Sequence, residues 1–256
     1  MLVIRFGIQV STLSTAALVT RDESFGLSAG RRLAVMVAGL SFGVYTLLFF
    51  AAIDRTSIDR AIAFSCLYPT MFVARDWIIT RRHPSLLATA GCSLIVAGAI
   101  SRISLSGHLY VGDALAAVSS LAFFAYLLSA EHALRGVAPI SALTLQIFTS
   151  AWSWLLVVFV ALPIWFAGRL TVTNNALLVG ALIGIIAALG HTALSQSQLR
   201  FGPVTAAAIA SLAPALSAFA GVLVFDRTGI VPALVSAAAV FSGVALVVYD
   251  RATVRA

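Results

Sequence analysis

Hydroxyl side chains that could bind a ligand flank two prolines, and each proline lies in the middle of a long apolar stretch. Pro69 lies in the segment CLYPTM and Pro214 in the segment SLAPAL. The hydroxyl-bearing neighbours are Ser65, Tyr68 and Thr70 around the first proline, and Ser211 and Ser217 around the second. Proline lacks an N–H, and its ring clashes with the carbonyl four residues back, so each proline frees backbone carbonyl groups. In lipid those carbonyls need partners inside the protein, which makes these segments candidates for packing kinks or for a substrate cavity.

Three further polar residues lie inside apolar stretches and complete the candidate substrate cavity: Tyr45, Gln146 and His191. The amide of Gln146 needs partners in hydrocarbon, either a substrate or another helix. His191 could bind substrate or carry protons, or it could be hydrogen-bonded within the helix bundle. The four histidines are scattered, and no zinc-protease, phosphate-loop or nucleophile-elbow motif is present. We therefore expect no metal, no cofactor and no enzymatic activity.

The composition places these residues in a membrane protein. Hydrophobic residues make up 61% of the 256 positions and charged residues only 10%, whereas a soluble domain is about a quarter charged. The net charge of +7 is scattered between apolar runs. It therefore indicates the positive bias of cytoplasmic loops and not a nucleic-acid surface. The expected partners are the lipid bilayer and a small-molecule substrate, with the chain a monomer or a homodimer.

A membrane-spanning helix needs about 20 mostly apolar residues, and nine stretches qualify or come close. They are 2–20, 33–53, 61–80, 86–101, 111–130, 142–167, 176–196, 204–225 and 231–249. The sequence thus predicts an all-α helix bundle of about nine spans. Two stripes of small residues, Gly39 with Gly43 and Gly180 with Gly184, predict close helix packing.

The arginines predict the orientation of the chain. One set of connectors holds Arg21, Arg31, Arg32, Arg81, Arg82, Arg135, Arg200, Arg251 and Arg255. The other set holds Arg5, Arg55, Arg60, Arg102, Arg169 and Arg227. Since cytoplasmic loops carry the excess of basic residues, the first set should be cytoplasmic. The C-terminus is then inside and, with nine spans, the N-terminus is outside.

An internal repeat relates the two proline segments. A shift of 145 positions aligns Pro69 with Pro214, and the same shift pairs Arg55 with Arg200 and Gly98 with Gly243. Pro69 lies in the third expected span and Pro214 in the eighth, an odd number of spans apart, so equivalent helices should cross the membrane in opposite directions. Such inverted repeats are typical of secondary transporters, whose substrate site lies at the repeat interface near the bilayer midplane.

Four segments, in this order and spacing, resemble the EamA-type transporters of the drug/metabolite transporter superfamily. They are IRFGIQVSTLSTAALVTR, FFAAIDRTSIDRAIAFSCLYPTMFVARDW, VGDALAAVSSLAFFAYLLSAEHAL and QLRFGPVTAAAIASLAPALSAFAGVLVFDR. The resemblance implies two inverted halves, here 1–106 with four spans and 107–256 with five. It also implies export or exchange of a small polar metabolite, amino-acid-like or drug-like, by alternating access across a bacterial inner membrane.

The family usually has ten spans, and nothing here matches its first, because Met1 falls just ahead of the segment that resembles the second. The start codon could lie further upstream, the chain could be a fragment, or it could be a nine-span variant. The alternatives to a transporter are therefore a non-transporting fragment or an assembly subunit. A membrane-embedded enzyme is a less favoured alternative.

Overall fold

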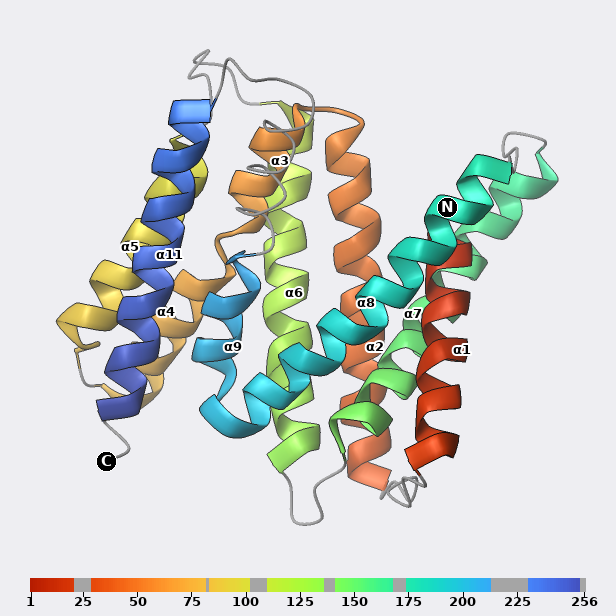
Figure 1. Cartoon of the computed structure of the whole chain (residues 1–256), viewed down its shortest axis with the longest axis horizontal. Coiled ribbons are helices and arrows are strands. Elements are labelled where there is room, and N and C mark those ends of the chain that lie inside the picture. The colour runs from red at the N-terminus through yellow and green to blue at the C-terminus, as the bar shows by residue number, and fades with distance from the viewer. Residues whose placement is uncertain are drawn as a thin grey trace. The chain divides into compact units, whose positions relative to one another are not determined.

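The computed structural model describes residues 1–20, 29–81, 83–101, 110–135, 141–167, 174–212 and 230–253. Within these ranges the regular structure is helical, with no strand (Figure 1). Six stretches are long and apolar enough to cross a membrane: 2–20, 30–53, 60–79, 111–135, 142–164 and 177–201. Two shorter apolar helices cover 86–100 and 234–250. The regular structure of the described residues is thus all-helical, and the six apolar stretches fit the membrane protein that the composition predicts, while the number of nine spans stays a prediction.

The observed helices follow the expected spans. They are α1 (Leu2–Thr20), α2 (Ala29–Ile53), α3 (Ile58–Ser65), α4 (Tyr68–Thr80), α5 (Leu86–Ile100), α6 (Val111–Arg135), α7 (Ala142–Phe166), α8 (Asn174–Phe201), α9 (Pro203–Ala210) and α11 (Ile230–Thr253). They form two compact units. The first unit contains 1–47 and 125–200, and the second contains 48–124 and 201–256. Each unit therefore combines segments of both expected repeats.

The span expected at 61–80 is not one kinked helix. It consists of two separate helices, α3 and α4. α3 ends where the N–H of Cys66 donates to the carbonyls of Ile62 and Ala63, at 3.1 and 3.3 Å. α4 starts at Tyr68, which places Pro69 in its first turn. A first-turn N–H has no partner within the helix, so a proline there loses no hydrogen bond. Pro69 therefore begins a helix and does not distort one.

A second helix break separates α8 from α9. The two helices are joined through Gly202, whose φ of 89° lies in the left-handed region. Residues with a side chain rarely adopt this conformation, so glycine suits the position. Pro203 then opens α9 with the dihedral that a first helical turn requires. Of the span expected at 204–225, the structure describes the residues up to 212.

The helix bounds recur at the spacing of the sequence repeat. A shift of 145 positions carries Ile58–Ser65, the whole of α3, onto Pro203–Ala210, the whole of α9. The same shift carries Ala29, which begins α2, onto Asn174, which begins α8. It also carries the start of α5 to within one residue of the start of α11. α6 is without a counterpart among the described helices.

In the first unit, the stripe of Gly39 and Gly43 packs against α7. A methyl group on Gly39 would lie 2.5 Å from Cβ of Trp152 and 2.8 Å from the carbonyl oxygen of Thr149. On Gly43 it would lie 3.2 Å from Cα of Ser153. The hydroxyl of Ser153 donates to the carbonyl of Gly39 at 2.7 Å. The two helices approach so closely here that only glycine fits.

The second glycine stripe packs against α1 in the same unit. A methyl group on Gly184 would lie 2.7 Å from the carbonyl oxygen of Arg5, and one on Gly180 would lie 3.1 Å from Cγ2 of Ile4. Gly39 and Gly184 are themselves 145 positions apart. Equivalent glycines of α2 and α8 thus provide the close approaches to α7 and α1, respectively.

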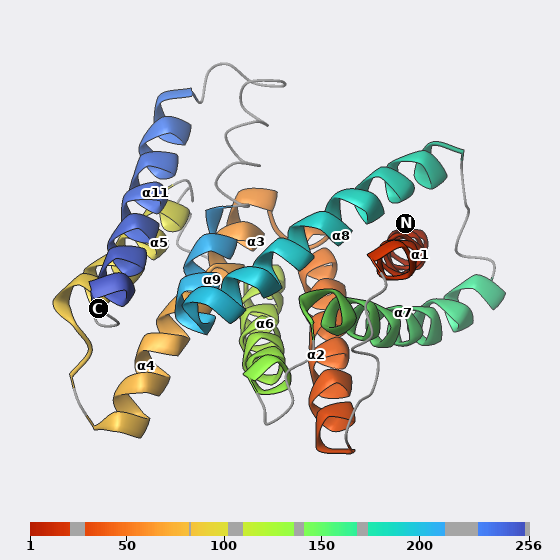
Figure 2. The same ribbon diagram turned by 60° about the horizontal axis from the view of Figure 1, so that its bottom comes forward.

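In the second unit, α5 and α11 lie side by side (Figures 1 and 2) and pack through reciprocal contacts. A methyl group on Gly91 would lie 2.7 Å from the carbonyl oxygen of Gly243, and one on Gly98 would lie 2.9 Å from that of Ser236. The shift of 145 carries Gly91 onto Ser236 and Gly98 onto Gly243. Exchanging the two helices by this shift therefore turns the contact between Gly91 and Gly243 into the contact between Ser236 and Gly98. Such an interface is self-complementary, as in a two-fold symmetric pair.

Candidate functional site

Aromatic side chains gather around Phe42, near the middle of α2 in the first unit. Its ring stacks on Tyr45, with centroids 5.8 Å apart, and meets His191 of α8 edge-on at 4.6 Å. The ring of Tyr126 from α6 lies 5.0 Å away. Phe42 and Tyr126 are buried, whereas Tyr45 and His191 keep part of their surface exposed. Two of the predicted cavity residues, Tyr45 and His191, thus share one aromatic neighbour.

Gln146 joins this group through a buried hydrogen-bond network. Its Nε2 donates to the hydroxyl oxygen of Tyr126 at 2.9 Å and to that of Ser195 at 2.6 Å. The amide therefore bridges α6, α7 and α8, which is the interhelical role that the sequence allowed. We call the six residues the Phe42 cluster: Phe42, Tyr45, Tyr126, Gln146, His191 and Ser195. It combines aromatic rings with neutral hydrogen-bonding groups, which are the kinds of side chain that contact a small polar molecule.

The hydroxyls closest to Pro69 satisfy their own backbone. Ser65 donates to the carbonyl of Ile62 at 2.9 Å, and Thr70 donates to the carbonyl of Leu67 at 2.6 Å. These carbonyls lie at the break between α3 and α4, where regular helix bonding stops. The sequence allowed the hydroxyls of Ser65 and Thr70 either to satisfy freed backbone carbonyls or to contact a substrate. In the structure, both hydroxyls donate to backbone carbonyls.

Tyr68 and Ser211 connect the two proline segments within the second unit. The hydroxyl of Ser211 lies 3.3 Å from that of Tyr68 and 3.2 Å from the carbonyl of Ala207. The ring of Tyr68 packs on Phe123 with centroids 4.7 Å apart. The end of α9 and the start of α4 are thus in contact. Pro214 and Ser217 lie outside the described residues.

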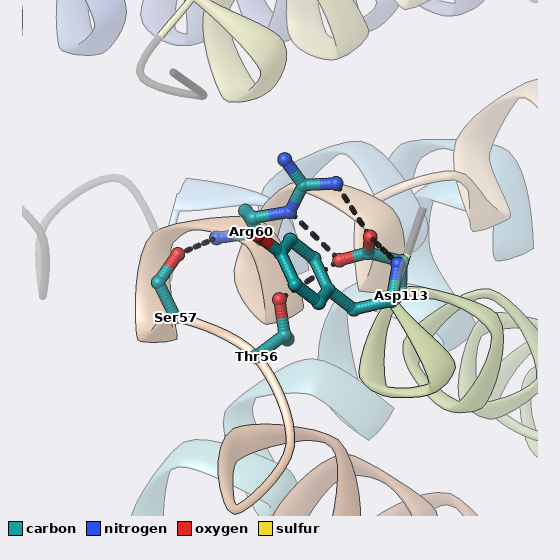
Figure 3. A network of polar contacts seen from close by, with 5 residues as sticks. Thr56, Ser57, Arg60 and Asp113 are labelled. Atoms are coloured by element: carbon teal, nitrogen blue, oxygen red, sulfur yellow. Dashed lines mark hydrogen bonds and ion pairs between the residues drawn. The ribbon is translucent and has the colours of Figure 1, made fainter. Parts of the chain in front are cut away.

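An ion pair that sequence reasoning missed fixes the start of α3 (Figure 3). Nε of Arg60 donates to Oδ1 of Asp113 at 2.9 Å, and its Nη2 donates to Oδ2 at 2.5 Å. Asp113 also accepts from the hydroxyl of Thr56 at 2.9 Å and from the N–H of Tyr110 at 2.8 Å. Both side chains are nearly buried, with 10% and 2% exposed. Arg60, which the sequence places among the loop arginines, is therefore a structural residue.

Next to this ion pair, the start of α6 packs closely against the end of α2. A methyl group on Gly112 would lie 2.8 Å from the carbonyl oxygen of Ala52 and from Cβ of Thr56. Ser57 caps α3 by accepting from the N–H of Arg60. An acid at the start of a helix is expected to stabilise its N-terminus, and Asp113 does so through the N–H of Tyr110. The Gly-Asp pair that opens α6 was the signal that could have predicted a close contact there.

Neither a metal nor a disulfide is indicated by the part of the chain that the structure describes. It has no group of three histidine, cysteine, aspartate or glutamate side chains that could hold a metal ion. Cys66 and Cys92 are buried and are not joined by a disulfide. The candidate site is therefore one of hydrogen-bonding and aromatic contacts.

Comparisons with known proteins bear on the fold. No model of a known protein family matches the chain, and no curated protein does so. Twenty-six chains of solved structures match it. One of them, described as "Crystal structure of protein", aligns with a TM-score of 0.71 and 16% identity over 100% of this chain and 88% of its own. At that identity the likeness shows a shared fold alone.

Proposed function

We propose that the chain is a secondary transporter of the EamA type, which moves a small polar metabolite by alternating access across a bacterial inner membrane. The observation that carries the proposal is the interruption of equivalent apolar segments. α3 stops at Ser65 and α9 stops at Ala210, which the shift of 145 positions superimposes. Interrupted helices at corresponding positions of two repeats are the best pointer to a transporter's binding site.

The packing of α5 on α11 supports the inverted arrangement of the two halves. Residues 91 and 98 of α5 meet residues 243 and 236 of α11, so the two helices run antiparallel. A two-fold axis that exchanges antiparallel helices is perpendicular to both of them. If both helices cross the bilayer, that axis lies in the membrane plane, which is the relation between inverted repeats.

The Phe42 cluster supplies groups that a transported molecule would contact in the first unit. The metabolite class follows from the family resemblance and the polar, aromatic character of these side chains. The C-terminus is proposed to be cytoplasmic and the N-terminus external, from the distribution of arginines.

Replacing Pro69 with alanine should abolish transport and leave the melting temperature close to that of the wild type. Alanine can continue a helix, so α3 and α4 can join and the break is lost, whereas the proline ring prevents this. Untargeted mass spectrometry of cells and medium measures transport without a known substrate. We expect at least one solute whose internal-to-external ratio changes with the wild-type protein and returns to the background level with the variant.

Pro163 provides the matched control, since it lies inside α7 and is exposed. Pro163→Ala should transport as the wild type does. The proposal fails if no solute ratio depends on the wild-type protein. The role of the helix break fails if Pro69→Ala transports normally.

A further inference from the structure

Arg5 is a half-buried cation on α1 for which the described residues provide no acid. Its Nε is buried and has no hydrogen-bond partner. The guanidinium carbon lies 5.1 Å from the ring centroid of Phe6, which is fully buried. None of the ion pairs found among the described residues includes Arg5. An ionisable side chain inside a membrane-spanning segment is costly, and such residues usually serve a function.

The packing of α1 places Arg5 beside the middle parts of α2 and α8, although it lies only one turn from the start of its own helix. The adjacent Phe6 packs edge-on against Phe42, with centroids 5.9 Å apart, and the carbonyl of Arg5 faces Gly184. Phe42 and Gly184 each lie roughly 15 Å or more from either end of their helices, at 1.5 Å per residue. If α2 and α8 cross the bilayer, an arginine side chain at this position is too short to reach the membrane surface.

A comparison with Arg31 shows what is specific to Arg5. Arg31 is more completely buried than Arg5, and its Nε also has no hydrogen-bond partner. However, it is the third residue of α2, at the end of a membrane-spanning helix, where lipid headgroups and water are close. Its charge is therefore explained by its position, while that of Arg5 is not.

Phe6 connects Arg5 to the Phe42 cluster. The guanidinium of Arg5 lies against the ring of Phe6, which packs edge-on against Phe42. The ring of Phe42 in turn contacts Tyr45 and His191, both of which are partly exposed. Arg5 thus adds a positive charge next to the aromatic and polar side chains of the Phe42 cluster, within one compact unit.

We propose that Arg5 binds the carboxylate of the transported molecule, so that the substrate class is singly charged organic carboxylates. This inference rests on the proposed transport function and specifies its substrate. A guanidinium matches a carboxylate with two parallel hydrogen bonds, which Nε and one Nη can donate. One guanidinium neutralises one negative charge. A doubly charged phosphate would leave a second charge uncompensated in the membrane, which disfavours it.

Ligand-dependent melting of the purified protein tests this inference without a transport assay. The probes are phenylacetate against phenylacetamide and 4-methylpentanoate against 4-methylpentanamide, at equal millimolar concentration and constant ionic strength. We expect the carboxylates to raise the melting temperature of the wild type and the amides to leave it unchanged, because a ligand stabilises the state that it binds.

The variants separate a binding role from a structural one. Arg5→Gln removes a half-buried charge whose Nε has no hydrogen-bond partner, so it should melt higher than the wild type in the absence of ligand. It should also bind the carboxylates roughly thirtyfold more weakly or worse, as expected when one partner of a buried charge pair is truncated. Arg5→Lys should keep part of the response because the charge remains. Arg31→Gln, the matched control, should keep all of it.

The inference is overturned if neither carboxylate stabilises the wild type, if the amides stabilise it equally, or if Arg5→Gln responds as the wild type does. These outcomes are distinguishable from failure of the transport proposal. Arg5-dependent carboxylate binding by a protein that changes no solute ratio would refute transport alone. Transport of an uncharged solute that is insensitive to Arg5→Gln would refute the carboxylate site alone.

Discussion

Gly243→Leu should prevent the chain from forming a stable, monodisperse membrane protein. A side chain at this position would collide with the carbonyl oxygen of Gly91 and would lie 2.9 Å from Cγ1 and 3.0 Å from the backbone nitrogen of Ile95. Two of these neighbours are backbone atoms, which cannot turn away as a side chain can. Overpacking typically costs about 1–3 kcal/mol, and a clash with backbone should exceed that range. Size-exclusion chromatography and thermal melting in detergent measure the effect.

Gly190→Leu is the control for this substitution. A methyl group on Gly190 would have no neighbour within 4 Å, and the residue lies inside α8, as Gly243 lies inside α11. The control carries the same change of size and helix propensity, so it should melt close to the wild type. Equal melting temperatures for the two variants would show that α5 and α11 do not pack through these glycines.

Asp113→Ala should give a large fall in melting temperature as well. The substitution leaves the guanidinium of Arg60 without its acid and removes the acceptor for the hydroxyl of Thr56 and the N–H of Tyr110. Removing one partner of a buried pair is strongly destabilising because the other charge stays buried. Replacing both partners, as in Arg60→Met with Asp113→Leu, should recover much of the lost stability. Thermal melting of the single and double variants measures this coupling.

The partly exposed pair of Arg75 and Asp76 offers the comparison. Their closest N and O atoms are 3.7 Å apart, and the side chains are 35% and 32% exposed. Exposed ion pairs contribute about 0–1 kcal/mol, so Asp76→Ala should hardly change the melting temperature. If Asp113→Ala were equally silent, the network in Figure 3 would not hold α3 against α6.

Much of the helical architecture could be predicted from the sequence, because in lipid the backbone must satisfy itself and apolar length then marks each helix. The start of α1 and the ends of α2 and α4 fall at the expected residues. The repeat of 145 positions, found from Pro69 and Pro214, reappears in the bounds of α3 and α9. Apolar length alone could not predict that α3 and α4 are separate helices, because both are apolar.

The residues of the candidate site were harder to predict, since their roles depend on contacts between distant segments. Gln146 could be singled out as an amide in hydrocarbon, but its partners Tyr126 and Ser195 lie on other helices. Arg5 and Arg60 each lie close to the start of a helix, so the sequence suggested loop charges for both. The partner of Arg60 is 53 positions away, and the depth of Arg5 follows only from the packing of α1 on α2 and α8.

The central claim is alternating access, and thiol labelling of the variant His191→Cys tests it most directly. The background would carry Cys66→Ala and Cys92→Ala, which remove the only native thiols. A membrane-impermeant thiol reagent is applied to sealed vesicles of either orientation, with Arg135→Cys as a control that should react from one side only. A transporter that exposes its site to each side in turn should let the thiol introduced in place of His191 react from both sides. Reaction from one side only, or from neither, would contradict the account.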